Sequence, residues 1–211
     1  LGATYYKLAM DVYDGTNVVD ATKLDALISN IRLKINGTQV RQYDKPSTLV
    51  AINKMHGIDT KFGTASGDKH ARIVMYFAEP QRRTPIGEDV LAWQMYTAAG
   101  VGSFSLEFDV SSAASAAFNV QVSREYAILP NVTQFSNIVW HSSQTLPNDT
   151  AGKPTTSTLQ KTAYYRIHAF AAADTFAGAQ VKVNDLIIRE FRTYEEYVSY
   201  NFDNALNVVD N

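Results

Sequence analysis

The segment Lys34–Arg41 reads KINGTQVR, and Lys182–Arg189 reads KVNDLIIR, with lysine, asparagine and arginine at the same three places. In the first segment, Asn36-Gly37 is a strong signal of a two-residue type I′ hairpin turn, because both central residues of that turn need positive φ. In the second segment, Asn184-Asp185 can adopt the same turn, at a higher cost because aspartate carries a Cβ. We therefore predict two β-hairpins with equivalent turns.

The likeness extends beyond the hairpins. When the sequence is shifted by 148 residues, from 34 to 182, no gap is needed and Asn53 aligns with Asn201. Upstream, the tetrapeptide YYKL at Tyr5–Leu8 is matched by YYRI at Tyr164–Ile167. Each copy reads as a strand, a loop, a hairpin and a short helix. Similar composition alone could produce this likeness, but an internal duplication explains it better, and its long period indicates two similar domains in tandem.

Most of the chain reads as β-strands. In Ser103–Val110, SFSLEFDV, every second residue is apolar, which is typical of a half-buried antiparallel strand. Short apolar alternations bounded by turn residues predict further strands at Thr4–Val12, Ile28–Ile35, Ala71–Ala78, Ala117–Leu129, Asn137–Ser143, Ala163–Ala171 and Val181–Phe191. Two short helices are predicted, Pro46–Met55 with a proline in its first turn and Thr193–Asn204 with two glutamates there.

The composition is that of an ordinary globular chain. Its 211 residues can bury a real core, and 45% of them are hydrophobic, which excludes wholesale disorder. The net charge is −2, so no basic excess indicates nucleic-acid binding. Cysteine is absent, which excludes disulfides and thiolate metal sites. No apolar run approaches the roughly 20 residues that a membrane-spanning helix needs.

The central segment Ala71–Val110 carries several features in a fixed order. A strand runs into Phe77-Ala78-Glu79-Pro80 and Arg82-Arg83, followed by Leu91-Ala92-Trp93 and by an alternating strand that contains Asp109. Together with the upstream IRLKINGTQVR and the helix after it, this order resembles the coat proteins of tailless icosahedral phages with an internal membrane, the corticovirus type. The resemblance covers Ile28–Leu129, and none of its motifs is catalytic.

The resemblance implies an all-β double jelly roll, in which two tandem antiparallel β-sandwiches stand upright in a capsid shell. With the internal repeat, it divides the chain into a first jelly roll at residues 1–112 and a second at residues 113–211. It implies a structural, non-enzymatic function in the virion, with trimers forming pseudo-hexagonal capsomers of an icosahedral shell around an internal membrane. The expected partners are further copies of the chain, minor capsid proteins and the viral membrane, without direct contact to nucleic acid.

The second copy departs from this pattern at its end. After its helix the first copy continues through two more predicted strands, whereas the second copy stops at Asn211. Either part of the C-terminal region is missing from the sequence, or the second jelly roll is completed in another way. The start at Leu1 instead of methionine similarly indicates a processed product or a clipped N-terminus.

No catalytic or cofactor-binding residue is assigned from the sequence. Neither a nucleophile elbow nor a P-loop nor an HExxH motif occurs. The four histidines are widely scattered without ligand-like spacing: His56, His70, His141 and His168. His168 lies in a strand pattern, where a packed or edge residue is a better interpretation than a catalytic base.

Acidic residues give one hint of a metal site, whose ligands the sequence leaves unknown. Glu107 and Asp109 share the exposed face of a predicted strand, and three aspartates crowd one predicted loop: Asp11, Asp14 and Asp20. Calcium takes several oxygen ligands from such clusters, but the loop lacks the ligand register of an EF-hand, so solvated surface is the better interpretation. The resemblance allows calcium at capsid interfaces without assigning its residues.

The segment Glu79–Arg83, EPQRR, has two interpretations of equal weight. It is either an intersubunit ion-pair site, in which the arginines offer bidentate donors, or a charged loop in water.

One alternative function is a carbohydrate-binding β-sandwich module. Such a module needs exposed aromatic side chains on one face, tryptophan above all, and Trp93 and Trp140 lie in different predicted domains. An enzyme ranks third, because no acid/base constellation stands out.

Overall fold

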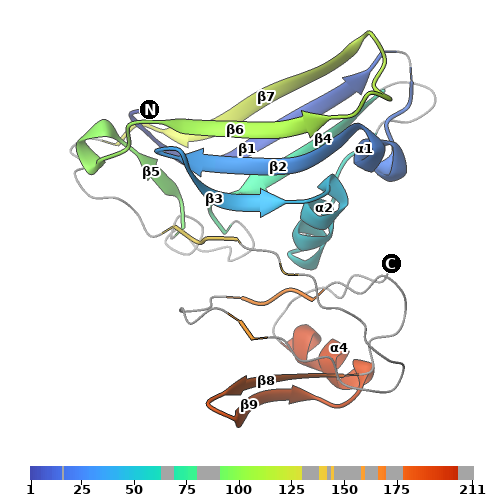
Figure 1. Cartoon of the computed structure of the whole chain (residues 1–211), viewed down its shortest axis with the longest axis vertical. Coiled ribbons are helices and arrows are strands. Elements are labelled where there is room, and N and C mark those ends of the chain that lie inside the picture. The colour runs from blue at the N-terminus through green and yellow to red at the C-terminus, as the bar shows by residue number, and fades with distance from the viewer. Residues whose placement is uncertain are drawn as a thin grey trace.

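The computed structural model describes residues 1–15, 17–62, 69–79, 91–129, 138–141, 144, 158–159, 166–169 and 178–203. Their strands and helices form two units, a β-sandwich in the first 127 residues and a hairpin followed by one helix near the C-terminal end (Figure 1). The fold is therefore mostly β, with a few short helices. Within the described part of the chain, no helix is both long and apolar enough to cross a membrane.

Strand β1 (Ala3–Asp14) organises the first sheet of the sandwich. It pairs antiparallel with β4 (His70–Tyr76), β5 (Trp93–Met95) and β7 (Phe118–Ala127). The second sheet has the order β3–β2–β6 and is also antiparallel. Its strands are β2 (Ile28–Ile35), β3 (Thr38–Tyr43) and β6 (Phe104–Val110). The turn between β2 and β3 is the hairpin predicted at Asn36-Gly37.

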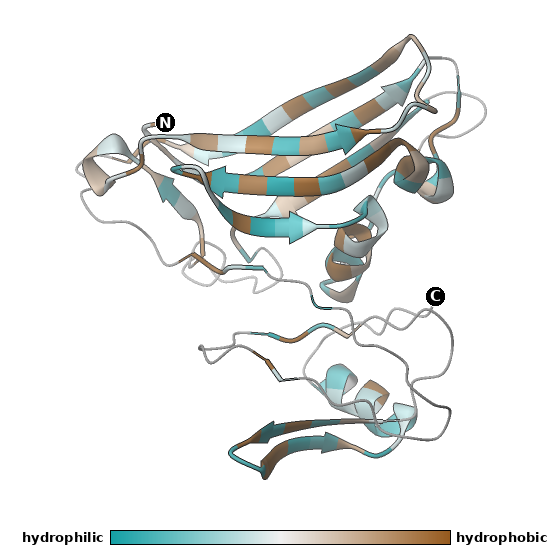
Figure 2. Ribbon diagram, viewed as in Figure 1, coloured by the Kyte–Doolittle hydropathy of each residue, from teal (hydrophilic) through white to brown (hydrophobic). Residues whose placement is uncertain are grey.

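The core lies between the two sheets, because each strand points its apolar side chains inward at every second position. Ile31, Leu33 and Ile35 of β2 are buried, while the residues between them are half exposed. Figure 2 shows this alternation as brown and teal bands along β2, β6 and β7. At one end of the core, Phe77 and Trp93 stack with their ring centroids 4.2 Å apart. Aromatic stacking of this kind adds to the stability that burial provides.

Two short helices flank the β2–β3 hairpin in the sequence, α1 before it and α2 after it. The helix α2 (Pro46–Met55) has the predicted bounds, begins with proline and buries Leu49. The helix α1 (Ala21–Leu27) was not expected. It begins at Asp20, whose side chain accepts a hydrogen bond from the backbone N–H of Lys23 at 2.7 Å. An aspartate before an apolar pattern is a helix-start signal, but the helix has only seven residues and is too short for a clear 3.6-residue period.

The second unit repeats the first hairpin in detail. Strands β8 (Ala179–Val183) and β9 (Leu186–Phe191) pair antiparallel, with an irregularity between Val181 and Lys182. The β2–β3 pair has the same irregularity between Leu33 and Lys34, which is the position shifted by 148 residues. Both turns have two positive φ angles, 50° and 76° at Asn36-Gly37 and 50° and 65° at Asn184-Asp185. The prediction of equivalent hairpins is confirmed.

The helix after each hairpin is also equivalent. The helix α4 (Tyr194–Asp203) covers the positions of α2 shifted by 148 residues. Its Glu195 and Glu196 lie in the first turn, as predicted, where the helix dipole favours acidic side chains. The side chains of Asn53 in α2 and Asn201 in α4 are both buried. The repeat therefore holds through strand, turn, strand and helix.

Two predicted strands are not formed where they are described. Residues 138–141, within the predicted strand Asn137–Ser143, and residues 166–169, within Ala163–Ala171, have no strand assignment. Residues 138–141 make one backbone contact with β3, from the N–H of His141 to the carbonyl of Val40 at 3.0 Å. A single bond of this kind does not make a ladder. Tyr164 and Tyr165, on which the upstream repeat depends, lie outside the described residues.

The predicted division of the chain at residues 112 and 113 remains a prediction. Strand β7 lies beyond that point and pairs with β1 along almost its whole length. The first sandwich therefore extends at least to Ala127.

Candidate assembly surfaces

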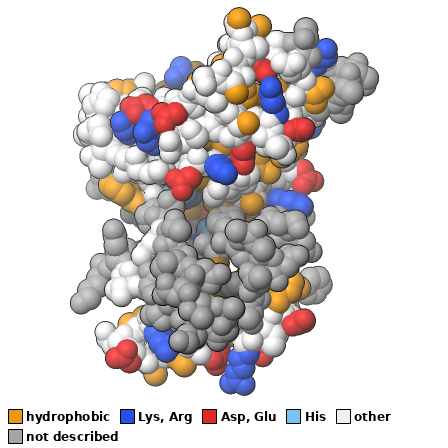
Figure 3. Space-filling model, turned by 45° about the vertical axis from the view of Figure 1, so that its right-hand side comes forward, with side chains coloured by type: hydrophobic (Ala, Val, Ile, Leu, Met, Phe, Trp, Pro, Cys, Tyr) orange, Lys and Arg blue, Asp and Glu red, His pale blue; other side chains and the backbone are white. Residues whose placement is uncertain are grey.

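The outer face of β2 and β6 carries the two carboxylates that the sequence placed there. Glu107 lies 2.7 Å from the ammonium of Lys34, and Asp109 lies 2.8 Å from the guanidinium of Arg32. Asn30 also donates to Asp109, at 2.8 Å. Cross-strand ion pairs on an exposed sheet face contribute little stability each. Both carboxylates are thus engaged within the sheet, and Figure 3 shows acidic and basic side chains beside one another on the sandwich.

The three aspartates expected in one solvated loop have separate roles. Asp11 and Asp14 belong to β1, and Asp20 caps α1. The side chain of Asp14 is fully buried, so the interpretation as solvated surface is wrong for this residue. Asp14 accepts a hydrogen bond from the backbone N–H of Ser115 at 2.8 Å and pairs with Lys23 at 3.1 Å. The Ser115 hydrogen bonds hold the pKa of Asp14 far below its usual range.

These contacts make Asp14 a structural anchor for the connection between β6 and β7. Within the described ranges of the chain, no group of three histidine or acidic side chains could hold a metal ion.

Three of the four scattered histidines converge where the sandwich meets the segments that lead to the second unit. The rings of His56 and His168 are 6.5 Å apart, and His141 packs edge-on against Tyr43 at 5.3 Å. Figure 3 shows histidine side chains at this level of the molecule. His70 lies elsewhere, stacked on Tyr13 of β1. His168 is a packed residue, as its sequence context indicated.

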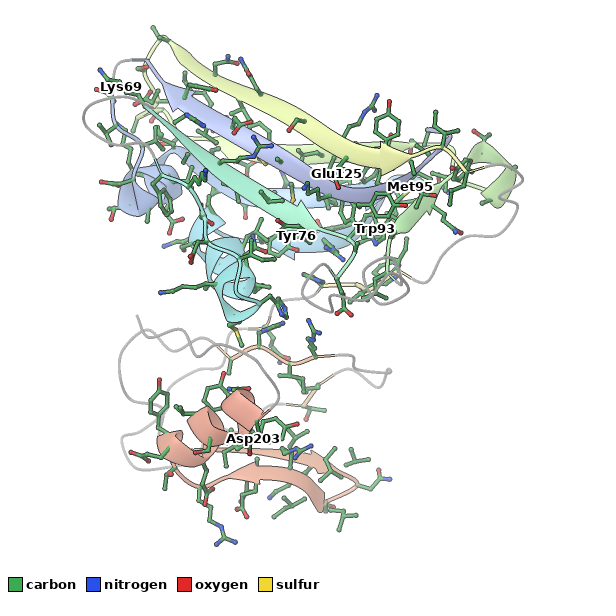
Figure 4. All side chains as sticks on the ribbon, turned by 180° about the vertical axis from the view of Figure 1, so that it is seen from behind. Lys69, Tyr76, Trp93, Met95, Glu125 and Asp203 are labelled. Carbon is green, nitrogen blue, oxygen red and sulfur yellow. The ribbon has the colours of Figure 1, made fainter. Side chains whose placement is uncertain are left out.

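Arg41 of β3 is buried at the same junction. Its guanidinium lies over the rings of Trp93 and Phe77, at 4.8 and 5.3 Å from their centroids. Nη1 donates to the backbone carbonyl of Tyr76 at 2.7 Å, and Nε donates to that of Val139 at 3.4 Å. Figure 4 labels Tyr76 and Trp93, which come from β4 and β5. Ring faces and carbonyls thus replace water around a buried cation.

The described part of the segment Glu79–Arg83 fits neither of its two interpretations, an intersubunit ion-pair site or a charged loop in water. Glu79 is buried, so it is not in water, and its carboxylate lies 2.9 Å from Nη2 of Arg166 in the same chain. The remainder of the segment, residues 80–83, lies outside the described residues. Sequence reasoning missed the pair of Glu79 and Arg166 because 87 positions separate the two residues.

A groove opens between β6 and β7, on the side of the sandwich away from the second unit. It has a volume of about 470 Å³. Its exposed lining is polar and apolar in similar measure and comes from both sheets: Leu1, Tyr5, Leu8, Phe104, Leu106, Val122, Ser123 and Arg124. Further exposed apolar side chains lie on β6, on β7 and just after β7: Val110, Tyr126, Ile128 and Leu129.

The second hairpin also exposes apolar side chains. Ile188 is 55% exposed, whereas its counterpart Val40 is 3% exposed. Val183 is 52% exposed, whereas its counterpart Ile35 is 6% exposed. Leu186 and Ile187, next to the turn, are exposed as well. The hairpin that is covered in the first unit is thus uncovered in the second.

The tryptophans do not form an aromatic face for sugar binding. Trp93 is fully buried in the sandwich core, and Trp140 is 61% exposed. A carbohydrate platform needs exposed rings together on one face, so the buried position of Trp93 weakens that alternative.

Comparisons with known proteins were made for the whole chain. The profile of the family described as "Viral coat protein P2 N-terminal domain" matches residues 1–123. Among solved structures, the crystal structure of the major capsid protein P2 from bacteriophage PM2 matches with a TM-score of 0.45 and 17% sequence identity. That match covers 61% of this chain and 42% of the PM2 protein, so this chain spans less than half of it. No curated protein matches.

The family match includes strands from both sheets of the sandwich and more than half of the chain. It agrees with the resemblance found in the central segment. The chain therefore belongs to the viral coat protein P2 N-terminal domain family, which gives it a structural role in a viral coat.

Proposed function

We propose that this chain is the major capsid protein of an icosahedral virus, built as a double jelly roll. The observation that carries the proposal is the second hairpin and helix. They repeat β2, β3 and α2 with the same register, irregularity and turn, at a constant shift of 148 residues. A coat protein with one sandwich and a second copy of its central hairpin has the elements that a tandem pair of jelly rolls requires.

The boundary between the two rolls lies after β7 in this proposal, not at residue 112. Strand β7 hydrogen-bonds to β1 and belongs to the first roll. The second roll then follows Leu129 and contains β8, β9 and α4. In the first roll, β6 pairs with β2 and the β1 sheet covers the inner face of the hairpin. The exposed apolar side chains of β8 and β9 need equivalent cover, which the rest of a second sandwich supplies.

The chain assembles as a trimer that forms a pseudo-hexagonal capsomer. A closed ring of three uses one heterologous interface three times, so two different surfaces of each copy must be complementary. The groove between β6 and β7 provides one candidate surface on the first unit, with apolar side chains from both sheets in its lining. Obligate interfaces bury on the order of 2,000 Å² or more.

The further partners follow from a shell of this type. Minor capsid proteins and an internal membrane lie next to the capsomers, nucleic acid is not contacted directly, and no chemistry is performed. Calcium is a candidate between copies, where ligands from two chains can combine. Within the described sandwich, Glu107 and Asp109 already pair with Arg32 and Lys34.

Sedimentation velocity of the full-length protein, with and without calcium, tests the assembly. We expect a trimer, and electron micrographs should show pseudo-hexagonal particles. The variant Val122→Glu places a charge in the groove and should shift the species to monomer. Gln121→Glu adds the same charge to the neighbouring exposed position of β7 and should leave the trimer intact.

A strictly monomeric protein at high concentration in both conditions would contradict the proposal. Retention of that monomer on polysaccharide would favour the carbohydrate-binding alternative.

A further inference from the structure

Two short segments that lie between the two units in the sequence, residues 138–141 and 166–169, contact the sandwich. The first segment lies against β3. The backbone N–H of His141 donates to Val40, and the side chain of Arg41 donates to Val139. Ile138 packs against the hydrophobic core. This segment is therefore attached to the sandwich through hydrogen bonds to its backbone and through one apolar side chain.

The second segment is held by Arg166, which reaches two different parts of the sandwich. Nη1 of Arg166 lies 2.9 Å from Nε2 of His56, just after α2, and Nη2 lies 2.9 Å from Glu79, just after β4. A guanidinium can only donate hydrogen bonds, so Nε2 of His56 must accept. His56 is therefore neutral, with its proton on Nδ1, as long as this contact exists.

Among the described residues, the charges that face the three histidines are mainly positive. Two guanidinium groups face them, Arg166 beside His56 and His168, and Arg41 beside His141. Tyr43 of β3 and the neighbouring histidine rings are neutral. Glu79 is the carboxylate that the described residues place against this group. The described surroundings of the three rings taken together thus hold two cations and one carboxylate, which disfavours a further positive charge there.

We propose that this junction is an acid-sensitive latch, in which protonation of His56, together with His168 and His141, releases segments 138–141 and 166–169 from the sandwich. Protonated His56 cannot accept from Arg166, and it places a second cation 2.9 Å from the first. The hydrogen bond then becomes a repulsion between two cations, which weakens the attachment of segment 166–169 to the sandwich.

The pKa values of the three histidines indicate that all three rings resist protonation in the latched form. Burial, and after it the charge of Arg166 and the His168 ring, lower the pKa of His56 to about 4, although Glu79 opposes the shift. Burial, followed by Arg41 and His168, lowers the pKa of His141 to about 2. The pKa of His168 is lowered by burial and by Arg166.

The sign of the pH effect follows from these directions. A released histidine has its ordinary pKa of about 6.5, so the released form binds more protons than the latched form. The latch is at full strength above that pH and weakens as the pH falls toward 4, where His56 in the latched form also becomes protonated. Asp14, whose pKa is lowered, stays ionised throughout this window and keeps the sandwich anchored.

Small-angle X-ray scattering of the full chain between pH 7.5 and 4 tests the latch, with circular dichroism at each pH to follow the β-structure. We expect the radius of gyration to rise below pH 6.5 while the β-signal is unchanged. In His56→Gln, the amide oxygen can still accept from Arg166 and cannot titrate. Its opening should occur about one pH unit lower than that of the wild type.

The matched control is His70→Gln, because His70 lies on β4 outside the junction. It should open at the same pH as the wild type. Glu79→Gln should open at a higher pH, since it removes the carboxylate that offsets the arginine. The proposal is overturned if the wild type keeps its radius at pH 4, if expansion coincides with loss of the β-signal, or if His56→Gln opens with the wild type.

Discussion

The hairpin β2–β3 and the hairpin β8–β9 have the same backbone but different surroundings. Their registers, irregularities and turns coincide at a constant shift of 148 residues, and so do the helices that follow. The apolar side chains of the first hairpin are buried, and those of the second are largely exposed. Turn chemistry and local alternation thus fix the shape of a hairpin, whereas burial depends on which other strands are present.

The two equivalent arginines show the same contrast. Arg41 is buried against Trp93 and two backbone carbonyls. Arg189 is exposed and lies over the ring of Tyr200 in the helix of its own unit, at 4.6 Å. The same residue at the same place in the repeat therefore has a long-range role in one unit and a local role in the other.

The largest effect is expected from removing apolar volume at the centre of the first hairpin. Leu33 is fully buried, so Leu33→Ala should lower the free energy of unfolding of the sandwich by about 2–5 kcal/mol. Urea denaturation followed by tryptophan fluorescence measures this change. The equivalent change Val181→Ala should leave that transition within about 0.5 kcal/mol of the wild type. Equal losses at the two positions would mean that the second hairpin is packed as tightly as the first.

Removal of the two equivalent arginines, Arg41 and Arg189, should have nearly as different effects on stability. Arg41→Ala leaves a cavity and unpaired carbonyls at Tyr76 and Val139, which should cost about 2–4 kcal/mol in urea denaturation. Arg189→Ala removes one exposed cation–π contact, worth about 0.5–1 kcal/mol, and only within its own unit. Hydrogen exchange of the β8–β9 amides would detect that local loss. A larger cost for Arg189→Ala than for Arg41→Ala would reverse the contrast.

Substitutions of the two turn asparagines, Asn36 and Asn184, should distinguish a local from a long-range contribution to stability. Asn36 adopts positive φ, and its side chain also accepts from the backbone N–H groups of Gly102 and Ser103 and donates to Gly100. Asn36→Ala should therefore destabilise the sandwich by about 2–3 kcal/mol in thermal or urea unfolding. Asn36→Gly keeps the turn and loses the side-chain contacts, so it should recover part of that loss.

At the second turn, Asn184→Ala should weaken only the β8–β9 hairpin, by about 1–2 kcal/mol through the cost of positive φ. Hydrogen-exchange rates of the β8–β9 amides measure this loss of hairpin stability. Wild-type exchange rates in Asn184→Gly would show that the Asn184 side chain adds no stability beyond permitting the positive φ of the turn.

The smallest effect is expected at the exposed tip of the second hairpin. Leu186 corresponds to Thr38 in the first copy and is exposed, so Leu186→Thr should change the stability of the isolated chain by less than about 0.5 kcal/mol. Thermal unfolding at low protein concentration measures this. A clear loss of stability there would show that Leu186 is covered within a single chain.

Most of the local elements can be predicted from short-range features of the sequence. Asn36-Gly37 and Asn184-Asp185 predicted both turns, the apolar alternation predicted β1, β2, β4, β6 and β7, and the proline at the start of α2 predicted its first turn. These features depend on residues that are close together in the chain, where turn φ angles and strand periodicity act directly. The resemblance of the central segment also indicated the family, because the order of the motifs can be read from the sequence without knowing any contacts.

Which of these elements are buried, and which polar groups contact one another, depends on the packing of the folded chain. The burial of Asp14, the pair of Glu79 with Arg166 and the convergence of His56, His141 and His168 join positions up to 112 residues apart. No period or motif records such contacts, because they arise from the packing of sheets and segments that the chain brings together only on folding. For the same reason the identical hairpins have opposite burial: a strand's neighbours, not its own residues, determine how much of it water reaches.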